Sequence, residues 1–214
     1  MHDDAVKNAL SAGRVVAIIR GLGPEQVRGV ARALLNGGIR CIEVTLNSPG
    51  AIESIGIIAS EFPEVVPGAG TVLEVEEVKE AVARGARFIV SPNVDPRVIE
   101  ETKALGRISI PGAMTPTEIV QALKAGADYV KIFPASVVGY KFFREMKGPF
   151  KDLKMVATGG ITPDDAAEYI RNGSYAVGLG SSLVPKEAVL KGDYKVIENL
   201  ARKLVESVRS VLGA

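Results

Sequence analysis

The chain has 214 residues, 47% apolar and 24% charged, a composition typical of a globular protein with a sizeable hydrophobic core. Its 26 Lys and Arg against 25 Asp and Glu leave a net charge of +1, which excludes a global field that attracts nucleic acid or an anionic membrane. The single cysteine, Cys41, and the single histidine, His2, exclude an internal disulfide and a Cys/His zinc site, so we expect no metal and no other cofactor.

The first residues, MHDDAVKNAL, contain two acids and lack the apolar segment of a signal peptide. The longest uncharged run, residues 172–185, is too short and too rich in Gly and Ser to span a membrane. We therefore expect a cytoplasmic protein. The N-terminal segment itself predicts a helix over about residues 2–12, ahead of the first strand.

One unit recurs along the chain: a segment rich in Ala and Leu, a glycine, and a short apolar strand. Examples are ARALLNGGIRCIEVTL, AVARGARFIVS, ALKAGADYVKIF and YIRNGSYAVGLG. The glycine supplies the left-handed residue with which many helices end. With the remaining units included, the pattern predicts eight strands, at residues 14–19, 40–46, 65–69, 87–91, 107–110, 128–133, 154–158 and 175–179.

Strands that alternate with helices pair in parallel through right-handed crossovers, and eight such units predict an α/β fold, a (β/α)8 TIM barrel with an extra N-terminal helix. We expect one domain over residues 1–214, with the barrel core at about 14–185 and a C-terminal helical tail at 186–214. The alternative is an open doubly wound sheet that binds a nucleotide at RGLGPEQ, a fragment that lacks the full G-x-G-x-x-G pattern.

Two charged residues interrupt strands that otherwise read as buried, Lys131 in DYVKIFPAS and Glu43 in RCIEV. Strand alternation places Lys131 with Tyr129 and Phe133 on the inner face of the barrel, and Glu43 on the inner face of its own strand. Active sites of such barrels lie at the carboxyl ends of the strands, where these two side chains can meet. A buried structural ion pair is the alternative interpretation.

A lysine amine attacks a carbonyl only when it is neutral, and burial increases the neutral fraction because it penalises the cation. Glu43 alone would oppose this by stabilising the ammonium. The carboxyl group therefore fits a proton carrier, because forming and dehydrating a carbinolamine both require a proton to move.

The last two strands end in TGGI, residues 158–161, and GLGSS, residues 178–182. TIM barrels commonly bind phosphate here through backbone N–H groups, and glycine allows the close approach that this requires. Two such loops on consecutive strands predict a phosphate site.

Taken together, these motifs resemble the 2-keto-3-deoxy-6-phosphogluconate (KDPG) aldolase family, including its 6-phosphogalactonate and 4-hydroxy-2-oxoglutarate relatives. The resemblance runs through IEVTLNSPGA, GAGTV, SPN, IPGAMTPTE, KIFPA, ATGGI and GLGSSLVP, in order, over about residues 14–185. It implies a class I aldolase of the Entner–Doudoroff pathway that forms pyruvate and glyceraldehyde 3-phosphate from a phosphorylated 2-keto acid, and a homotrimer.

The resemblance also implies roles for individual residues. Lys131 is the Schiff-base lysine and Glu43 the general acid/base. The substrate-binding residues are Thr71 for the pyruvate carboxylate and Pro92 and Phe133 for the shape of the pocket, and the phosphate-binding residues are Gly159, Gly160, Gly180 and Ser181.

Two positions give conflicting evidence on the substrate epimer. Asn47 stands where many gluconate-type members have an arginine that binds the substrate carboxylate, and Arg20 at the end of the first strand is the alternative cation, as in galactonate-type enzymes. Thr158, in contrast, is typical of the gluconate type, because its hydroxyl can donate to a substrate hydroxyl. The epimer stays open at this point.

Two other functions fit a barrel with this phosphate site. One is an isomerase or synthase with a different catalytic set, although such barrels often use a histidine, and the only one here lies near the N-terminus. The other is a non-catalytic phosphate-binding barrel, which would have lost the lysine or the glutamate. Both residues are present.

Overall fold

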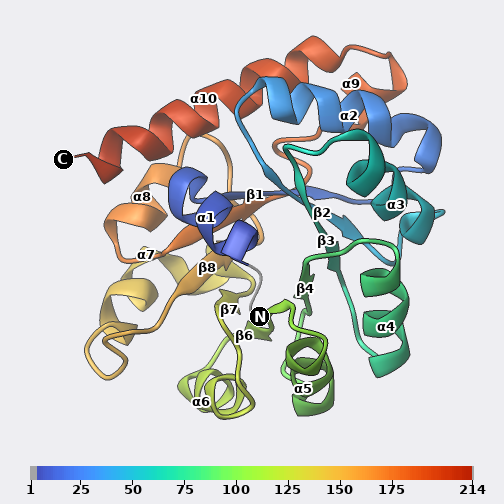
Figure 1. The fold of residues 1–214 in the computed structure, drawn as a ribbon. Coiled ribbons are helices and arrows are strands. Elements are labelled where there is room, and N and C mark those ends of the chain that lie inside the picture. The colour runs from blue at the N-terminus through green and yellow to red at the C-terminus, as the bar shows by residue number, and fades with distance from the viewer. Residues whose placement is uncertain (1–3, 214) are drawn as a thin grey trace.

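Residues 4–213 are described in the computed structural model, and strands and helices alternate along them (Figure 1). The strands are β1 (Val15–Ile19), β2 (Cys41–Thr45), β3 (Val66–Gly70), β4 (Phe88–Val90), β5 (Ile108–Ile110), β6 (Gly112–Ala113), β7 (Val130–Ile132), β8 (Met155–Thr158) and β9 (Ala176–Leu179). The helices are α1 (Asp4–Gly13), α2 (Pro24–Asn36), α3 (Ala51–Glu61), α4 (Val75–Ala83), α5 (Pro96–Ala104), α6 (Pro116–Lys124), α7 (Ala135–Met146), α8 (Ala166–Arg171), α9 (Lys186–Leu190) and α10 (Tyr194–Leu212). The predicted N-terminal helix is confirmed as α1, and residues 2 and 3 of that prediction lie outside the described part.

All strand pairs are parallel, in the order β5, β4, β3, β2, β1, β9, β8, β7, β6. The two ends of this order are consecutive in the chain, because only Pro111 separates β5 from β6. β4 pairs with β5 and β7 with β6, and Lys131 donates its backbone N–H to the carbonyl of Pro111 at 2.8 Å. The sheet therefore closes into the predicted (β/α)8 barrel, and the open doubly wound alternative is wrong.

The strand predicted at 107–110 needs one correction. It continues to Ala113 and is divided at Pro111, which has no N–H to donate to a ladder. The other seven predicted strands are confirmed with shifts of at most a few residues at their ends. Glycine also ends the repeated helices as predicted: Gly126 and Gly173 have φ of 98° and 101°, in the left-handed region.

Two hydrophobic clusters confirm the predicted strand faces. Ile42, Val44, Val130 and Ile132 pack between the sheet and the helices. Cys41, Tyr129, Phe88 and Ile108 fill the barrel interior with Val6 and Leu10 of α1, so α1 covers the end of the barrel at which the strands begin. Figure 1 shows α1 lying across the centre of the barrel from this side. The opposite end, where the strands finish, remains for a site.

Helices α9 and α10 follow Pro185 and belong to the outer layer. α10 buries Ile197, Ala201, Leu204 and Val208 and contacts α2 and α8, beside which it runs in Figure 1. The apolar face of α10 explains this packing, because a helix with one apolar stripe is stable only when that stripe is covered.

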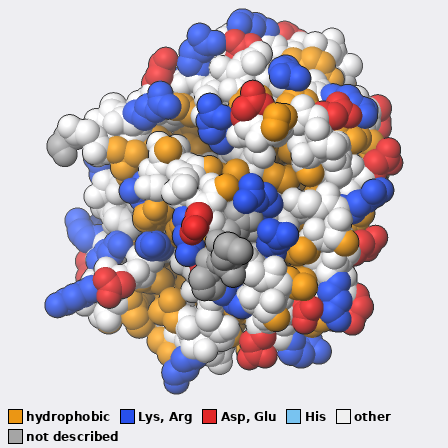
Figure 2. All heavy atoms as spheres, in the orientation of Figure 1, with side chains coloured by type: hydrophobic (Ala, Val, Ile, Leu, Met, Phe, Trp, Pro, Cys, Tyr) orange, Lys and Arg blue, Asp and Glu red, His pale blue; other side chains and the backbone are white. Residues whose placement is uncertain are grey.

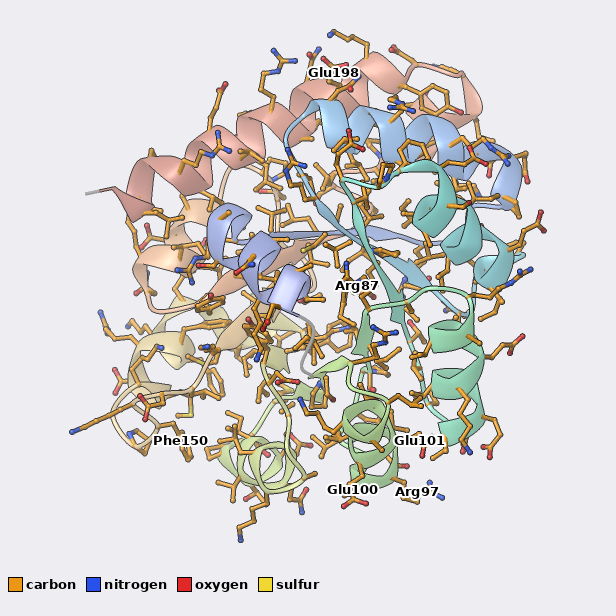
Figure 3. All side chains as sticks on the ribbon, in the orientation of Figure 1. Arg87, Arg97, Glu100, Glu101, Phe150 and Glu198 are labelled. Atoms are coloured by element: carbon orange, nitrogen blue, oxygen red, sulfur yellow. The ribbon has the colours of Figure 1, made fainter. Side chains whose placement is uncertain are left out.

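Most charged side chains lie on the outside of the molecule. Basic and acidic side chains are interspersed on the face shown in Figure 2. Arg97, Glu100 and Glu101 point away from the barrel on α5 (Figure 3), and Glu198 of α10 accepts hydrogen bonds from Lys195 and Arg202. Within residues 4–213, no helix is long and apolar enough to cross a membrane.

Candidate active site

Two buried charges mark the interior of the barrel near its open end. Glu43 on β2 and Lys131 on β7 are 2% and 4% exposed, and they are the only charged residues among residues 4–213 that are buried. Burial of a charge costs several kcal/mol unless a partner or a change of protonation compensates it. A fold that tolerates this cost at two positions is typical of a site that uses them.

Both charges are held by strand geometry. Lys131 lies opposite Gly112 on one side and Val156 on the other, in the middle of the parallel ladder. Glu43 lies opposite Ile18 and Gly68. Its side chain crosses the end of β3 at Gly70, where a methyl group would lie 2.7 Å from Cγ of Glu43 and overlap the carboxylate. Glycine at position 70 therefore leaves the space that the Glu43 carboxylate occupies.

Glu43 and Lys131 do not form a direct ion pair. Oε1 of Glu43 has no hydrogen-bond partner in the described part of the chain, and no ion pair joins the two side chains. Instead, both side chains line a small cavity together with Thr158. This cavity has a volume of about 10 Å³, which is room for about one water molecule. The structural ion pair considered from the sequence is therefore absent, while the expected proximity of the two groups is confirmed.

The neutral form of each group is favoured by its surroundings. Burial lowers the pKa of Lys131, the charge of Glu43 opposes this shift, and the charge of Arg20 adds to it. Burial also raises the pKa of Glu43, against the opposing effects of Lys131 and Arg20. A neutral amine can attack a carbonyl and a protonated carboxyl group can donate a proton, so this electrostatic environment suits nucleophilic catalysis assisted by an acid/base.

A pocket of about 470 Å³ opens beside Lys131. Its lining includes many of the predicted site residues: Arg20, Lys131, Phe133, Thr158, Gly159, Gly160, Gly180 and Ser181. Nζ of Lys131 lies 4.8 Å from the ring centre of Phe133, which forms part of the apolar wall around the amine. Thr158 is 5% exposed and lines both this pocket and the small inner cavity. The pocket thus runs from the buried amine to the two glycine loops.

The glycine loop after β8 has an unusual backbone conformation and is tied to the glycine loop after β9. Gly159 and Gly160 have φ of 94° and 70°, and a methyl group at Gly159 would lie 2.9 Å from the Phe133 ring. The loop after β9 is tied to the loop after β8, because the hydroxyl of Ser182 donates to the carbonyl of Ile161 at 2.6 Å. Glycine at both positions leaves the backbone of this loop without side chains, so a bound anion can approach it closely.

Arg20 extends from a loop that is held in place by the neighbouring strand. The backbone N–H of Gly21 donates to Oγ of Ser48 at 2.8 Å, and Ser48 is also 2.9 Å from Oγ1 of Thr45. The hydroxyl of Thr45 in turn donates to the carbonyl of Ile19. The LNSP motif therefore orders the chain around Arg20, whose guanidinium faces the pocket that contains Lys131.

Besides Glu43, three predicted site residues lie at the same end of the barrel but outside the lining of the large pocket. Asn47 is exposed in the turn after β2, and Pro92 follows β4, with its carbonyl against Gly112. Thr71 follows β3 with φ of 58°, an unusual conformation for a β-branched residue. Such strain is often found at functional sites, where the surrounding structure maintains it.

The sequence reasoning missed several residues that line the pocket. They are Ile18, Ile161, Thr162, Gly178, Ser182, Val184 and Lys186. Ile18 and Gly178 lie two residues before Arg20 and Gly180, on the same inward face of their strands, so strand alternation could have predicted them. Lys186 was not, because it lies beyond the last strand and reaches the pocket only through the turn that follows β9.

Comparison with known proteins identifies the family. The model of a family described as "Aldolase: KDPG and KHG aldolase" matches residues 6–200. The chain belongs to this family. It is 37% identical to the 2-dehydro-3-deoxy-phosphogluconate aldolase of Treponema pallidum, over 94% of this chain and 96% of the relative. It is 40% identical to a probable 2-dehydro-3-deoxy-6-phosphogalactonate aldolase of Rhizobium meliloti, over 85% and 86% of the two chains.

A solved structure within the family bears on the chemistry. The KDPG aldolase of Legionella pneumophila, with pyruvate captured as a covalent carbinolamine, is 31% identical to this chain with a TM-score of 0.86, and the match covers 92% of this chain and 96% of that one. This chain is thus an aldolase, a carbon–carbon lyase of the KDPG and KHG family, and the resemblance noted from its motifs is confirmed. Its relatives include both gluconate and galactonate types, so they leave the epimer undecided.

Proposed function

We propose that this protein is a class I aldolase that cleaves 2-keto-3-deoxy-6-phosphogluconate, or its galactonate epimer, to pyruvate and glyceraldehyde 3-phosphate. The observation that carries the proposal is a buried, unpaired lysine at one end of a pocket whose other end is formed by two glycine loops, with a buried, unpaired glutamate beside it in an adjoining small cavity. A substrate with a 2-keto acid at one end and a phosphate at the other matches this arrangement. 4-Hydroxy-2-oxoglutarate has the same pyruvate half and is a second expected substrate.

In the proposed reaction, the neutral amine of Lys131 attacks the C2 carbonyl, and a proton passes to the oxygen to give a carbinolamine. Loss of water leaves a protonated imine. The C4 hydroxyl then gives up its proton while the C3–C4 bond breaks, and the bonding electrons pass to the imine as an enamine. Protonation at C3 and hydrolysis release pyruvate. Glu43 lines the same small cavity as Lys131 and is the group that accepts and returns these protons.

The remaining residues bind the ends of the substrate. In this proposal Thr71 and Arg20 contact the carboxylate end, because Asn47 lacks a charge, and Pro92 and Phe133 shape the pyruvate pocket. Thr158 lies between the amine and the glycine loops, and its hydroxyl donates to the C4 hydroxyl, the centre at which the two epimers differ. The phosphate lies against the backbone of Gly159, Gly160, Gly180 and Ser181.

Trapping with pyruvate tests the proposal directly. The protein is incubated with pyruvate and borohydride, digested, and examined by mass spectrometry over residues 128–136. We expect a reduced pyruvyl adduct on Lys131, and cleavage assays with both phosphorylated epimers then assign the substrate. Folded protein that forms no adduct would contradict the proposal and favour the non-catalytic phosphate-binding barrel.

The assembly state and location are further proposals. Apolar side chains of Leu73, Met114 and Val137 are 44%, 40% and 67% exposed in segments that follow β3, β6 and β7, which supports a surface that is covered in a homotrimer. Light scattering after size exclusion should give about three times the 22.5 kDa mass of one chain. A monomeric mass at micromolar concentration would exclude the trimer. The cytoplasmic location stays a prediction of the sequence.

A further inference from the structure

A third cation lines the pocket besides Lys131 and Arg20. Lys186, the first residue of α9, lies in the same lining as Gly159, Gly160, Gly180 and Ser181. It reaches this place because the chain turns sharply after β9, where the backbone N–H groups of Leu183 and Val184 both donate to the carbonyl of Gly180, at 2.9 and 2.8 Å. The glycine loop and Lys186 are therefore parts of one short structural unit.

The backbone that carries Lys186 is firmly anchored. Leu183 and Val184, shortly before it in the chain, are 0% and 7% exposed, and Ala188 and Val189 in α9 are buried as well. The side chain itself is exposed. A fixed backbone with a solvated ammonium at the rim of a pocket allows the charge to meet a ligand without reordering the loop.

Lys186 has no partner of its own. Within residues 4–213 it makes no ion pair and no side-chain hydrogen bond, although Glu187 is adjacent. Glu187 is instead engaged by Lys191, whose Nζ lies 2.6 Å from Oε1 of Glu187. Lys191, directly after α9, is thus paired with an acid of that helix, whereas Lys186 at the pocket has no such pair among residues 4–213.

The cations of the pocket also separate by position. Arg20 acts on both reacting groups, since its charge lowers the pKa of Lys131 and of Glu43. Lys186 lines the large pocket with the glycine loops and does not line the small cavity that Glu43 and Lys131 share. The glycine loops themselves offer neutral N–H groups, whereas a phosphate monoester carries between one and two negative charges near pH 7.

We propose that Lys186 is the cation that neutralises the substrate's terminal phosphate, so that it determines the preference of this site for phosphorylated over unphosphorylated 2-keto acids. This inference rests on the proposed aldolase function and adds a specificity residue to it. A lysine can bind phosphate as a point charge without a fixed hydrogen-bond geometry, which suits an exposed side chain beside the two glycine loops.

The test compares Lys186→Gln, Lys186→Arg and the control Lys191→Gln with the parent protein. Lys186→Gln keeps a hydrogen-bond donor but removes the charge, and Lys191→Gln removes a paired charge directly after the same helix. For cleavage of the phosphorylated 2-keto-3-deoxy acid we expect KM to rise on the order of tenfold in Lys186→Gln, with kcat changed much less. Lys186→Arg and Lys191→Gln should retain the parent KM.

Two further measurements separate the charge from a structural role. With unphosphorylated 2-keto-3-deoxygluconate, Lys186→Gln should have the same kcat/KM as the parent. Added salt should weaken binding of the phosphorylated substrate less in this variant than in the parent. An unchanged KM for the phosphorylated substrate, or an equal loss on both substrates, would overturn the role of Lys186. Borohydride trapping of pyruvate should be equal in all four proteins, whereas failure of trapping in the parent would overturn the aldolase function itself.

Discussion

Gly70→Ala is expected to disable proton transfer by displacing Glu43. The added methyl would lie 2.7 Å from Cγ of Glu43, whereas ordinary van der Waals contact begins at 3.4 Å, so Cγ must move by about 0.7 Å and the carboxylate further. Because the side chain is enclosed by the barrel, this movement shifts the carboxylate from its position in the cavity that it shares with Lys131. A displacement near 1 Å costs on the order of 10²-fold in rate, so we expect kcat for cleavage to fall about 10- to 100-fold.

A matched control is available on the same strand. Gly68 faces the same interior, and a methyl there would meet the ring of Phe88, so Gly68→Ala crowds the core without an equivalent contact with the Glu43 carboxylate. Both variants should lose about 1–3 kcal/mol of unfolding free energy from overpacking, measured by urea denaturation.

The deciding assay is the exchange of hydrogen for deuterium at the methyl group of pyruvate in D2O, which is monitored by NMR. The exchange requires Lys131 to form an imine and an acid/base to move a proton at C3. We expect Gly70→Ala to form the borohydride adduct and to lose most of the exchange, while Gly68→Ala retains both. Wild-type exchange and cleavage in a folded Gly70→Ala variant would refute the assigned position and role of Glu43.

Four further predictions concern the charged residues. Lys131→Ala should remove both the pyruvate adduct and aldol cleavage while the circular dichroism spectrum is retained, and substantial residual turnover would exclude the Schiff-base role. Glu43→Gln should still form the adduct but lose cleavage by about 10²-fold or more, so turnover equal to the parent would exclude an acid/base function. Adduct formation should increase with pH as Lys131 loses its proton, with a midpoint below the ordinary lysine value of 10.5. Since Arg20 helps to lower the pKa of Lys131, Arg20→Gln should move this midpoint upward and reduce adduct formation near neutral pH, and an unmoved midpoint would contradict the proximity of Arg20.

The local pattern of the sequence was enough to predict the architecture and the two central residues. Strand alternation places Lys131 and Glu43 inside the barrel because side chains in a strand have a period of two, a property of the backbone that is independent of the rest of the fold. The glycines after the repeated helices and the TGGI and GLGSS loops are equally local, since each reflects a backbone conformation or an approach distance.

Contacts between distant segments were decided only by the tertiary structure. Closure of the barrel depends on the division of one strand at Pro111, where β4 and β7 pair with successive halves. The separation of Glu43 from Lys131, the space that Gly70 leaves for the carboxylate, and the return of Lys186 to the glycine loops depend on side chains and turns that meet across the barrel. Periodicity reports which face of an element a residue occupies, but distances between elements follow from how the whole core packs, and that information is shared among many residues.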